Sequence, residues 1–427
     1  MPRRVLDILI DNFEISDDIV LRTPHRLDFS DWRSLARLPM PELKDTPFVP
    51  RTLWGASHHH TCVFDEIRDQ DYLVHHPFDS FSAVETFVSQ AACDPAVAGI
   101  KMTLYRIGED SPLVDLLIDA ADAGKQVAVL VELKARFDER NNIRWATRLE
   151  EAGVHVVYGL EKLKTHCKLC LVVRKEPSGV RRYAHIGTGN YNGTTAQVYT
   201  DVSLFTAAQD VLDDVSEVFN ALTGYSQRVD YRELLVAPAG LRDRLVALID
   251  REIDHAREGR PARIVIKNNA ITDVQVITAL YRASQAGVPI DMVVRGVCCL
   301  RPGVPGVSQN IRVRSVVGRF LEHSRMYCFE NGGEADLYIG SADLMDRNLD
   351  RRSKRCAVFA TAPSHASCAR SCSRRTCATT SAPTSSSIAR IVEYRDYPMT
   401  RWSARKRLLL DWYTSKAGHA EDSQLLA

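Results

Sequence analysis

The stretch LIDAADAGKQVAVLVELKAR, residues 117–136, has the pattern of one unit of an α/β fold. Its first eight residues predict a helix, and the glycine that closes them, at position 124, is a common residue at a helix C-terminus. The short, valine-rich run that follows predicts a buried strand. Because strands of a parallel sheet are connected by helices, the stretch indicates an α/β domain.

Strands and helices alternate along the rest of the chain as well. In the first half we expect a second amphipathic helix after this stretch, and strands at 100–106, 126–137, 155–159 and 168–173. From about residue 240 the order begins again, with predicted strands at 263–269, 289–300, 325–333 and 336–344. We therefore predict an α/β fold with two related domains.

The second half contains a counterpart of the opening stretch, LYRASQAGVPIDMVVRGVCC at 280–299. Further on, the sequences HCK at 166–168 and GTGN at 187–190 correspond to HSR at 323–325 and GSAD at 340–343. Each half thus supplies one histidine and one cation. Two related units of this kind predict a site on the seam between them.

These patterns divide the chain into five predicted segments. Residues 1–60 are expected to be an extended arm or the remnant of a preceding head domain, 61–230 the first domain and 231–352 the second. Residues 353–390 have an atypical composition and are predicted to be disordered, since 361–387 contain no large apolar residue that could form a core. Residues 391–427 are expected to be a C-terminal tail. An altered reading frame from about Ser353 would explain the change.

Composition sets the broad class of the protein. The 427 residues carry 55 basic and 54 acidic side chains, so a nucleic-acid partner is not expected. No run of about 18 apolar residues occurs and acidic residues follow the start closely, so we expect neither a membrane-spanning segment nor a signal peptide, and a cytoplasmic location. The eleven cysteines match no zinc spacing and are interpreted as reduced thiols.

The stretch KLKTHCKLCLVV, residues 162–173, places charge inside an apolar run. In one continuous strand Lys164, His166 and Lys168 would share a face, because side chains alternate between the faces. A strand end at the surface, with solvated lysines, is the alternative for an isolated H-x-K motif. The matching His323 and Arg325 in the second half favour a functional site.

Two histidines flanked by cations suit phosphoryl transfer. A neutral imidazole nitrogen is a nucleophile toward phosphorus, nearby cations neutralise the phosphoryl oxygens, and a second histidine can act as an acid or as electrostatic support. Arg106, Arg136 and Arg295 follow predicted strands, where α/β sheets commonly bind ligands. No G-x-x-x-x-G-K-[ST] sequence occurs, so a nucleotide is not expected to be held by a P-loop.

The paired H-x-K motifs resemble those of the phospholipase D superfamily, whose full signature adds an aspartate five residues after the lysine. That position is Val173 in the first half and Glu330 in the second, and Arg325 replaces the second lysine. A phospholipase D-like phosphodiesterase is therefore only an alternative interpretation. A further alternative is an inactive fragment that binds the substrate without transferring a phosphoryl group.

The sequence is similar over about residues 25–352 to polyphosphate kinases of the first family, which contain two C-terminal phospholipase D-like domains. The blocks that carry the resemblance are DYLVHHPFDSF (71–81), IKMTLYRIGEDSP (100–112), VELKARFDERNNIRWATRLEEAGVHVVYG (131–159), LKTHCKL (163–169), YAHIGTGNYN (183–192), YTDVSLFT (199–206), VVRGVCCLRPGVPGVSQNIRVRSVVGRFLEH (293–323) and ENGGEADLYIGSADLMDRNLDRR (330–352). Family members begin with a helical domain and most of a head domain that precede the part matched here.

The resemblance implies a reversible ATP:polyphosphate phosphotransferase that forms a phosphohistidine. Its phosphorylated histidine corresponds to His166, and the second active-site histidine, near ATP, to His323. The tyrosine and arginine that contact ATP correspond to Tyr199 and Arg295. We expect Lys168 to neutralise the transferred phosphoryl group.

Two arginines that the family associates with its magnesium-phosphate site correspond to Arg106 and Arg136. A guanidinium cannot ligate Mg²⁺, so we interpret both as clamps on phosphates that the metal also contacts. The expected partners are ATP or ADP and inorganic polyphosphate. We also expect a homo-oligomer that is cytoplasmic, with peripheral association at the membrane as an alternative.

Overall fold

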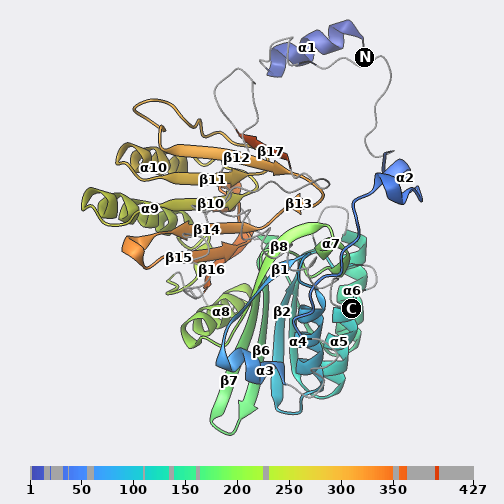
Figure 1. Ribbon diagram of the computed structural model, residues 1–427. Helices are drawn as coiled ribbons and strands as arrows, with labels where there is room; N and C mark the ends of the chain where they lie inside the picture. Colours follow the sequence, from blue (N-terminus) through green and yellow to red (C-terminus); the bar gives the residue numbers. More distant parts are fainter. Residues whose placement is uncertain are drawn as a thin grey trace. The chain divides into compact units, whose positions relative to one another are not determined.

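The computed structural model describes the chain over residues 2–13, 20, 32–36, 38–54, 62–108, 111–133, 139–159, 164–224, 230–349, 355–362 and 390–393 (Figure 1). The chain divides into two compact units, Met1–Pro47 and Phe48–Ala427. The first unit contains α1 (Arg3–Phe13), α2 (Trp32–Ala36) and the short 3₁₀ helix η2 (Pro41–Leu43). None of the helices in the described ranges is long and apolar enough to cross a membrane.

The second unit begins with a sheet in the strand order β1-β8-β7-β6-β2-β3-β4. Its strands are β1 (Tyr72–His76), β2 (Val97–Leu104), β3 (Gln126–Val131), β4 (His155–Tyr158), β6 (Lys168–Glu176), β7 (Gly179–Gly187) and β8 (Tyr199–Thr206). The strands β2, β3 and β4 are parallel, whereas β6, β7, β8 and β1 continue the sheet in antiparallel steps. The sheet is therefore mixed, with the predicted parallel part at one edge.

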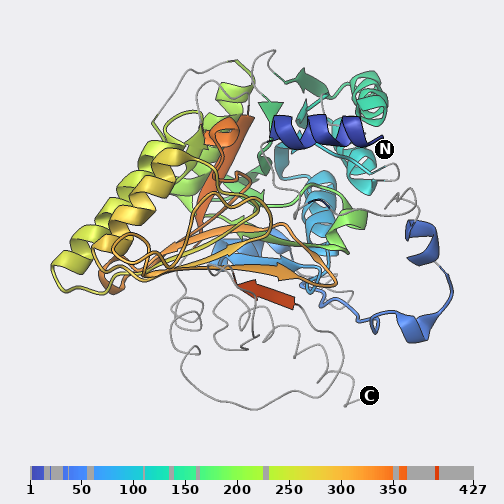
Figure 2. The ribbon, with the colours of Figure 1, turned by 90° about the horizontal axis from the view of Figure 1, so that it is seen from above.

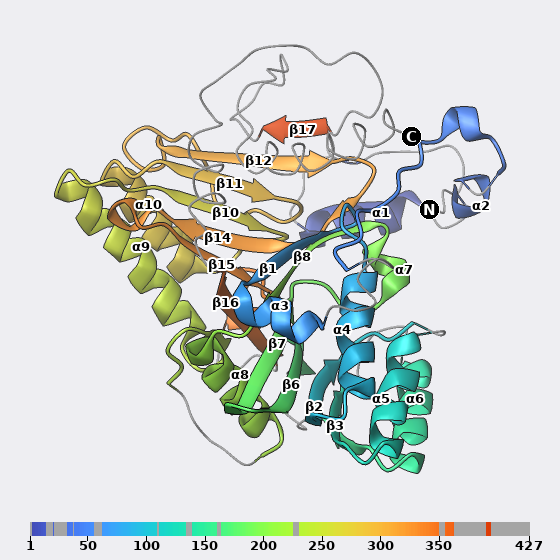
Figure 3. The ribbon, with the colours of Figure 1, turned by 60° about the horizontal axis from the view of Figure 1, so that its bottom comes forward.

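Helices cover both faces of this first sheet. They are α3 (Val63–Asp69), α4 (Ser82–Cys93), α5 (Pro112–Asp122), α6 (Glu139–Glu151), α7 (Gly193–Ala196) and α8 (Gln209–Leu222). On one face α3, α4, α5 and α6 share an apolar cluster with the strands, and α8 packs on the other face against β6 and β7 (Figure 3). Strands buried on both sides explain the long apolar runs in the sequence.

A second sheet has the strand order β17-β12-β11-β10-β14-β15-β16-β5, with β9 paired to β16. Its strands are β5 (Lys164–Thr165), β9 (Leu235–Ala237), β10 (Ile264–Asn268), β11 (Ile290–Val294), β12 (Ile311–Val317), β14 (Arg325–Phe329), β15 (Asp336–Gly340), β16 (Arg355–Ala362) and β17 (Arg390–Glu393). The remaining elements are β13 (Leu321–Glu322), α9 (Leu241–Arg257), α10 (Val274–Gln285), η4 (Asn331–Gly333) and α11 (Asp346–Leu349). The helices α9 and α10 run side by side against one face of this sheet (Figure 2).

The internal repeat that the sequence predicts is confirmed in the strand register. Lys168 pairs with Gly187 between β6 and β7, and Arg325 pairs with Gly340 between β14 and β15. Each of the helices α5 and α10 is followed by a glycine with positive φ, Gly124 at 81° and Gly287 at 91°. A glycine adopts this left-handed backbone without a Cβ penalty, so the two helices end where the sequence predicts.

The two sheets face each other across an apolar seam. Val202 and Leu204 of β8 belong to the same buried cluster as Val265 of β10, Met326 of β14 and Ile339 of β15. This buried cluster joins the two sheets within the described part of the second unit. It lies on the seam where the sequence predicts the site.

Two predictions about secondary structure were wrong. Residues 162–173 do not form one strand: β5 ends at Thr165, β6 begins at Lys168, and the two belong to different sheets. In the segment 353–390, which we expected to be disordered, residues 355–362 form β16, because they complete the sheet beside β15. Most of that segment, 363–389, and the tail after 393 lie outside the described residues.

Candidate active site

His166 lies at the break between β5 and β6, where the chain passes from one sheet to the other. Its ring meets the ring of Tyr105 edge-on, with 5.0 Å between the centroids. The buried Lys168 directs its Nζ over the same tyrosine, 5.1 Å from the centroid, and donates to the carbonyl of His166 at 2.5 Å. His166 itself is half-exposed, so the imidazole is open to a ligand beside a fixed positive charge.

Two buried side chains hold the chain on either side of His166. Thr103, at the end of β2, donates its hydroxyl to the carbonyl of Cys167 at 2.9 Å and accepts from the amide of Leu169 at 3.0 Å. Glu132, just past β3, accepts from the amide of Thr165 at 2.9 Å. These bonds satisfy backbone groups that would bond to a neighbouring strand if the strand were continuous. They therefore stabilise the interruption between β5 and β6.

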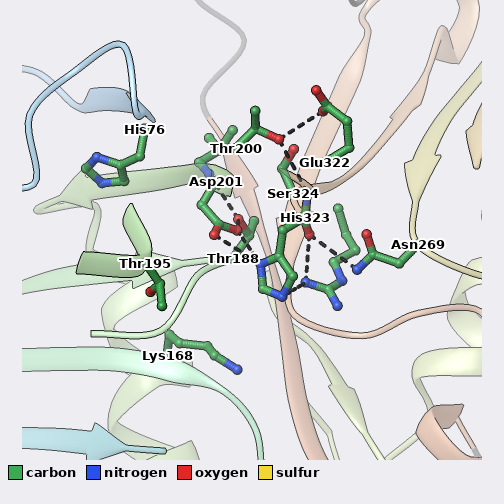
Figure 4. A network of polar contacts seen from close by, with 12 residues as sticks. His76, Lys168, Thr188, Thr195, Thr200, Asp201, Asn269, Glu322, His323 and Ser324 are labelled. Carbon is green, nitrogen blue, oxygen red and sulfur yellow. Dashed lines mark hydrogen bonds and ion pairs between the residues drawn. The ribbon is translucent and has the colours of Figure 1, made fainter. Parts of the chain in front are cut away.

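His323 occupies the matching place between β13 and β14, and a buried carboxylate fixes its ring. The Nδ1 atom lies 2.8 Å and 3.0 Å from the two oxygens of Asp201, while Nε2 lies 3.1 Å from a guanidinium nitrogen of Arg325 (Figure 4). A guanidinium only donates, so Nε2 accepts and the Nδ1 proton goes to Asp201. His323 is therefore a neutral imidazole with a defined tautomer in this structure.

Burial and the charges around His323 favour the neutral form of its imidazole. Burial lowers the pKa of His323, and the positive charges of Arg325 and Lys168 lower it further against the opposing effect of Asp201. Burial alone would raise the pKa of Asp201, yet its interaction with His323, the hydrogen bond from Thr188 and the charge of Arg325 hold that pKa below the usual value. A deprotonated carboxylate thus stands beside a neutral histidine.

Asp201 is a functional residue that the sequence analysis did not single out, although it lies in the quoted block YTDVSLFT. It is fully surrounded: Thr188 donates to its Oδ1 at 2.6 Å, and a Cβ built on Gly189 would meet its Oδ2 at 2.4 Å. Only glycine fits at 189, because any other residue would displace the carboxylate. An aspartate inside an apolar strand was the available signal, since an unpaired charge there is costly.

Arg325 is bound on both sides. Besides contacting His323, it donates to the carboxylate of Asp343 at 3.1 Å from Nε and 3.3 Å from a terminal nitrogen. Burial would raise the pKa of Asp343, but Arg325 lowers it below its usual range. In the first half the counterpart of Asp343 is the neutral Asn190. The cation of the second half is thus balanced by a carboxylate, whereas the first half has an amide at that position.

The other predicted residues lie around these two histidines. Tyr199, the first residue of β8, packs its ring 5.3 Å from that of His323. Arg106 follows β2, with its guanidinium 5.7 Å from the centroid of the Tyr105 ring. Arg295 follows β11, and burial together with Arg325 lowers its pKa. One of its terminal nitrogens is buried with no hydrogen-bond partner among the residues the structure describes, so it can serve an anionic ligand.

The two H-x-cation motifs converge, as the repeat predicts. Figure 4 shows Lys168 of the first half extending toward His323 of the second, and the charge of Lys168 lowers the pKa of His323. The cation of the first motif therefore lies close enough to the second motif to act on its histidine.

Comparison with known proteins assigns both halves of this arrangement. The profile described as polyphosphate kinase C-terminal domain 1 matches residues 62–228, and the profile for C-terminal domain 2 matches residues 234–371. The chain belongs to the polyphosphate kinase family. The predicted family and the predicted α/β fold are confirmed.

Individual relatives agree with this assignment. The polyphosphate kinase of Streptomyces coelicolor is 54% identical over 370 residues, which is 86% of this chain and 50% of that protein. The polyphosphate kinase 1 of Chlorobaculum tepidum is 54% identical over 352 residues, covering 82% and 50%. The crystal structure of the Porphyromonas gingivalis polyphosphate kinase superimposes with a TM-score of 0.72 at 36% identity, covering 87% of this chain and 58% of that one. The chain spans about half the length of the curated relatives it matches.

Of the two arginines expected at a magnesium-phosphate site, Arg106 lies within the described residues of this polyphosphate kinase family member. Arg136 lies outside the described residues. Within the ranges that the structure describes, no group of three or more His, Cys, Asp or Glu side chains could hold a metal ion. The described residues around Arg106 fit phosphate oxygens, to which Mg²⁺ also binds, better than the metal itself.

Proposed function

We propose that this protein transfers the γ-phosphoryl group of ATP reversibly to inorganic polyphosphate through a phosphohistidine at His166. The supporting observation is the pairing of unlike histidines: a half-exposed His166 beside Lys168, and a neutral His323 oriented by Asp201. The family profiles cover both halves of the site. Family membership favours phosphotransfer over the phosphodiesterase alternative.

In the first step a neutral ring nitrogen of His166 attacks the γ-phosphorus. A P–N bond forms, the bond to the bridging oxygen breaks, and ADP leaves with its electron pair. Lys168 and Arg106 balance charge on the transferred oxygens, since both cations lie near the Tyr105 ring, which packs against His166. Mg²⁺ bound to the nucleotide would neutralise further phosphate charge.

In the second step an oxygen at the end of a polyphosphate chain attacks the phosphorus, and the P–N bond breaks. His323 is placed to exchange a proton with the oxygen that leaves or attacks, because its Nε2 is an acceptor in this structure. Asp201 would stabilise the imidazolium that forms. Tyr199 and Arg295, beside His323, are proposed to contact ATP.

The proposal is tested by incubation with γ-labelled ATP, quenching at alkaline pH and mapping of the label. We expect acid-labile label on His166, none in His166→Ala, and transfer of the label to added polyphosphate. An acid-stable label, or unchanged labelling in His166→Ala, would refute the mechanism. Hydrolysis of bis-p-nitrophenyl phosphate without ATP would favour the phosphodiesterase, and binding of polyphosphate without any labelling would favour an inactive fragment.

Three further expectations belong to the same proposal. Mg²⁺ is proposed as the metal that accompanies ATP, a homo-oligomer as the assembled state, and peripheral association as the form of any membrane contact. Omission of Mg²⁺ with chelator, light scattering and vesicle sedimentation test them in turn. Labelling that persists without any divalent ion, or a monomer at assay concentration, would contradict the first two.

A further inference from the structure

The nitrogen of His323 that could attack phosphorus is covered by Arg325. In a neutral imidazole one nitrogen carries the proton, and only the other has a lone pair that can form a bond to phosphorus. The proton of His323 lies on Nδ1, which faces Asp201, so the lone pair lies on Nε2. A guanidinium nitrogen of Arg325 lies 3.1 Å from Nε2 and donates to it. The nucleophilic position of this histidine is therefore occupied in the structure.

Asp343 holds the guanidinium of Arg325 in this place. The carboxylate accepts from Nε at 3.1 Å and from one terminal nitrogen at 3.3 Å, while the other terminal nitrogen also donates to the carbonyl of His323 at 2.7 Å. Together with the contact to Nε2, four of the five N–H groups of the guanidinium are engaged. Asp343 is itself fixed, because its Oδ1 accepts from the amide of Asn269 at 3.1 Å. The buried guanidinium thus has a defined position over the imidazole.

The first half has a different pair of residues at the corresponding positions. The strand registers make Lys168 equivalent to Arg325, and Asn190 is then equivalent to Asp343. Lys168 donates to the carbonyl of the histidine two residues before it, as Arg325 does. A lysine has one nitrogen where an arginine has three, and an amide has no charge with which to hold a cation. The arginine–aspartate pair is therefore a chemical difference between the two motifs.

We propose that Asp343 determines which of the two histidines carries the phosphoryl group. By holding Arg325 on Nε2, it prevents formation of a P–N bond at His323. The inference rests on the proposed function, in which His166 is the phosphoryl carrier. Asp343 acts through Arg325 and does not itself contact the reacting atoms, so it is a positioning residue that sets specificity.

Two physical effects support this role. A phosphoryl group on Nε2 of His323 would need the space that the nitrogen of Arg325 fills 3.1 Å away, whereas exchange of a proton needs only a brief displacement of that nitrogen by the reacting oxygen. Against the effect of burial, Arg325 lowers the pKa of Asp343, so the two charges balance each other. A balanced cation gives less support to an anionic phosphoryl group. Both effects disfavour phosphorylation of His323 and leave its action as an acid or base intact.

Phosphoramidate tests the inference without ATP, because it transfers its phosphoryl group directly to neutral imidazole nitrogens. The lone pair of the histidine forms the new P–N bond, the P–N bond of the reagent breaks, and ammonia leaves. The modified residues are mapped by proteolysis and mass spectrometry at alkaline pH. The exposed His155 serves as the internal reference for the dose of reagent. In the wild-type protein we expect His155 to be modified and His323 to be protected.

The central variant is Asp343→Asn, and Asp343→Glu is the matched control that keeps the charge. We expect modification of His323, relative to His155, to rise by roughly tenfold in Asp343→Asn, which is the usual worth of a hydrogen bond to a charged group. In Asp343→Glu it should stay near the wild-type level. If the unpaired guanidinium prevents folding, Asp343→Asn is combined with Arg325→Lys, which reproduces the pair of the first half, and the same rise is expected.

Three outcomes would overturn the inference. One is equal modification of His323 in the wild type and in folded Asp343→Asn, because burial alone would then protect the ring. Another is an equal rise in Asp343→Asn and Asp343→Glu, which would indicate general loosening of the packing. The last is failure of both asparagine variants to fold, because the pair would then be a structural ion pair. If the wild type takes no label from ATP, the proposed function fails, but the phosphoramidate result still decides whether Asp343 keeps His323 covered.

Discussion

Replacing Asp201 by asparagine tests the charge that supports His323. The amide keeps the shape of the side chain but removes the negative charge that lies 2.8 Å and 3.0 Å from Nδ1. Two charges whose centres are about 4 Å apart interact by about 4 kcal/mol at an effective dielectric constant of about 20. Since 1.36 kcal/mol is tenfold, the loss of imidazolium stabilisation should slow turnover by up to roughly a thousandfold.

Both steps of the proposed reaction should slow in Asp201→Asn, because His323 meets the oxygen that leaves and the oxygen that attacks. Rapid-quench labelling of His166 measures the first step, and chase with unlabelled polyphosphate measures the second. The limb of the pH profile that belongs to His323 should move to lower pH, because Asp201 raises the pKa of this histidine. The outward-lying Asp213→Asn is the matched control. Rates for both steps within threefold of wild type would refute the reasoning.

Three other predictions concern Lys267, Gly189 and His185. Lys267 is 3% exposed and lies 2.8 Å from Glu322, the residue before His323. Lys267→Met should therefore lower the free energy of unfolding, measured in urea, by about 3–5 kcal/mol, and adding Glu322→Gln should restore part of this loss. If the losses of the two single variants simply add in the double variant, this pairing is contradicted. Gly189→Ala should reduce turnover more than it lowers the melting temperature, because the new Cβ displaces Asp201; a wild-type kcat would contradict it. Burial lowers the pKa of His185 to about 3 from 6.5, so the unfolded state binds the proton first and stability falls as the pH drops below 6.5. At pH 5 this amounts to about 2 kcal/mol, and His185→Gln should flatten the decline of melting temperature between pH 6.5 and 5.

The C-terminal region shows how composition and pairing can disagree. The segment that begins at residue 353 was predicted to be disordered from its composition, yet Arg355–Ala362 pairs with three other strands of the second unit. The apolar residues of CAVFA are enough for one strand when neighbouring strands are available to pair with it. The prediction of disorder used the average composition of many residues, whereas a single strand that pairs with an existing sheet needs only a short apolar stretch.

The sequence by itself determined much of this protein. Local periodicity and the closing glycines predicted the α/β units, and the repeated H-x-cation motifs predicted the matching register of β6–β7 and β14–β15. These features depend on residues close together in the chain, where spacing alone sets which side chains share a face.

Only the tertiary structure decided the chemical difference between the two histidines. Asp201 is 122 residues away from His323, and no local pattern couples them. The break of residues 162–173 between two sheets likewise depends on β16, a strand almost 200 residues later in the chain. Contacts of this kind arise from strand register across the seam, so the nucleophile and its partner histidine acquire their separate environments only when the chain is folded.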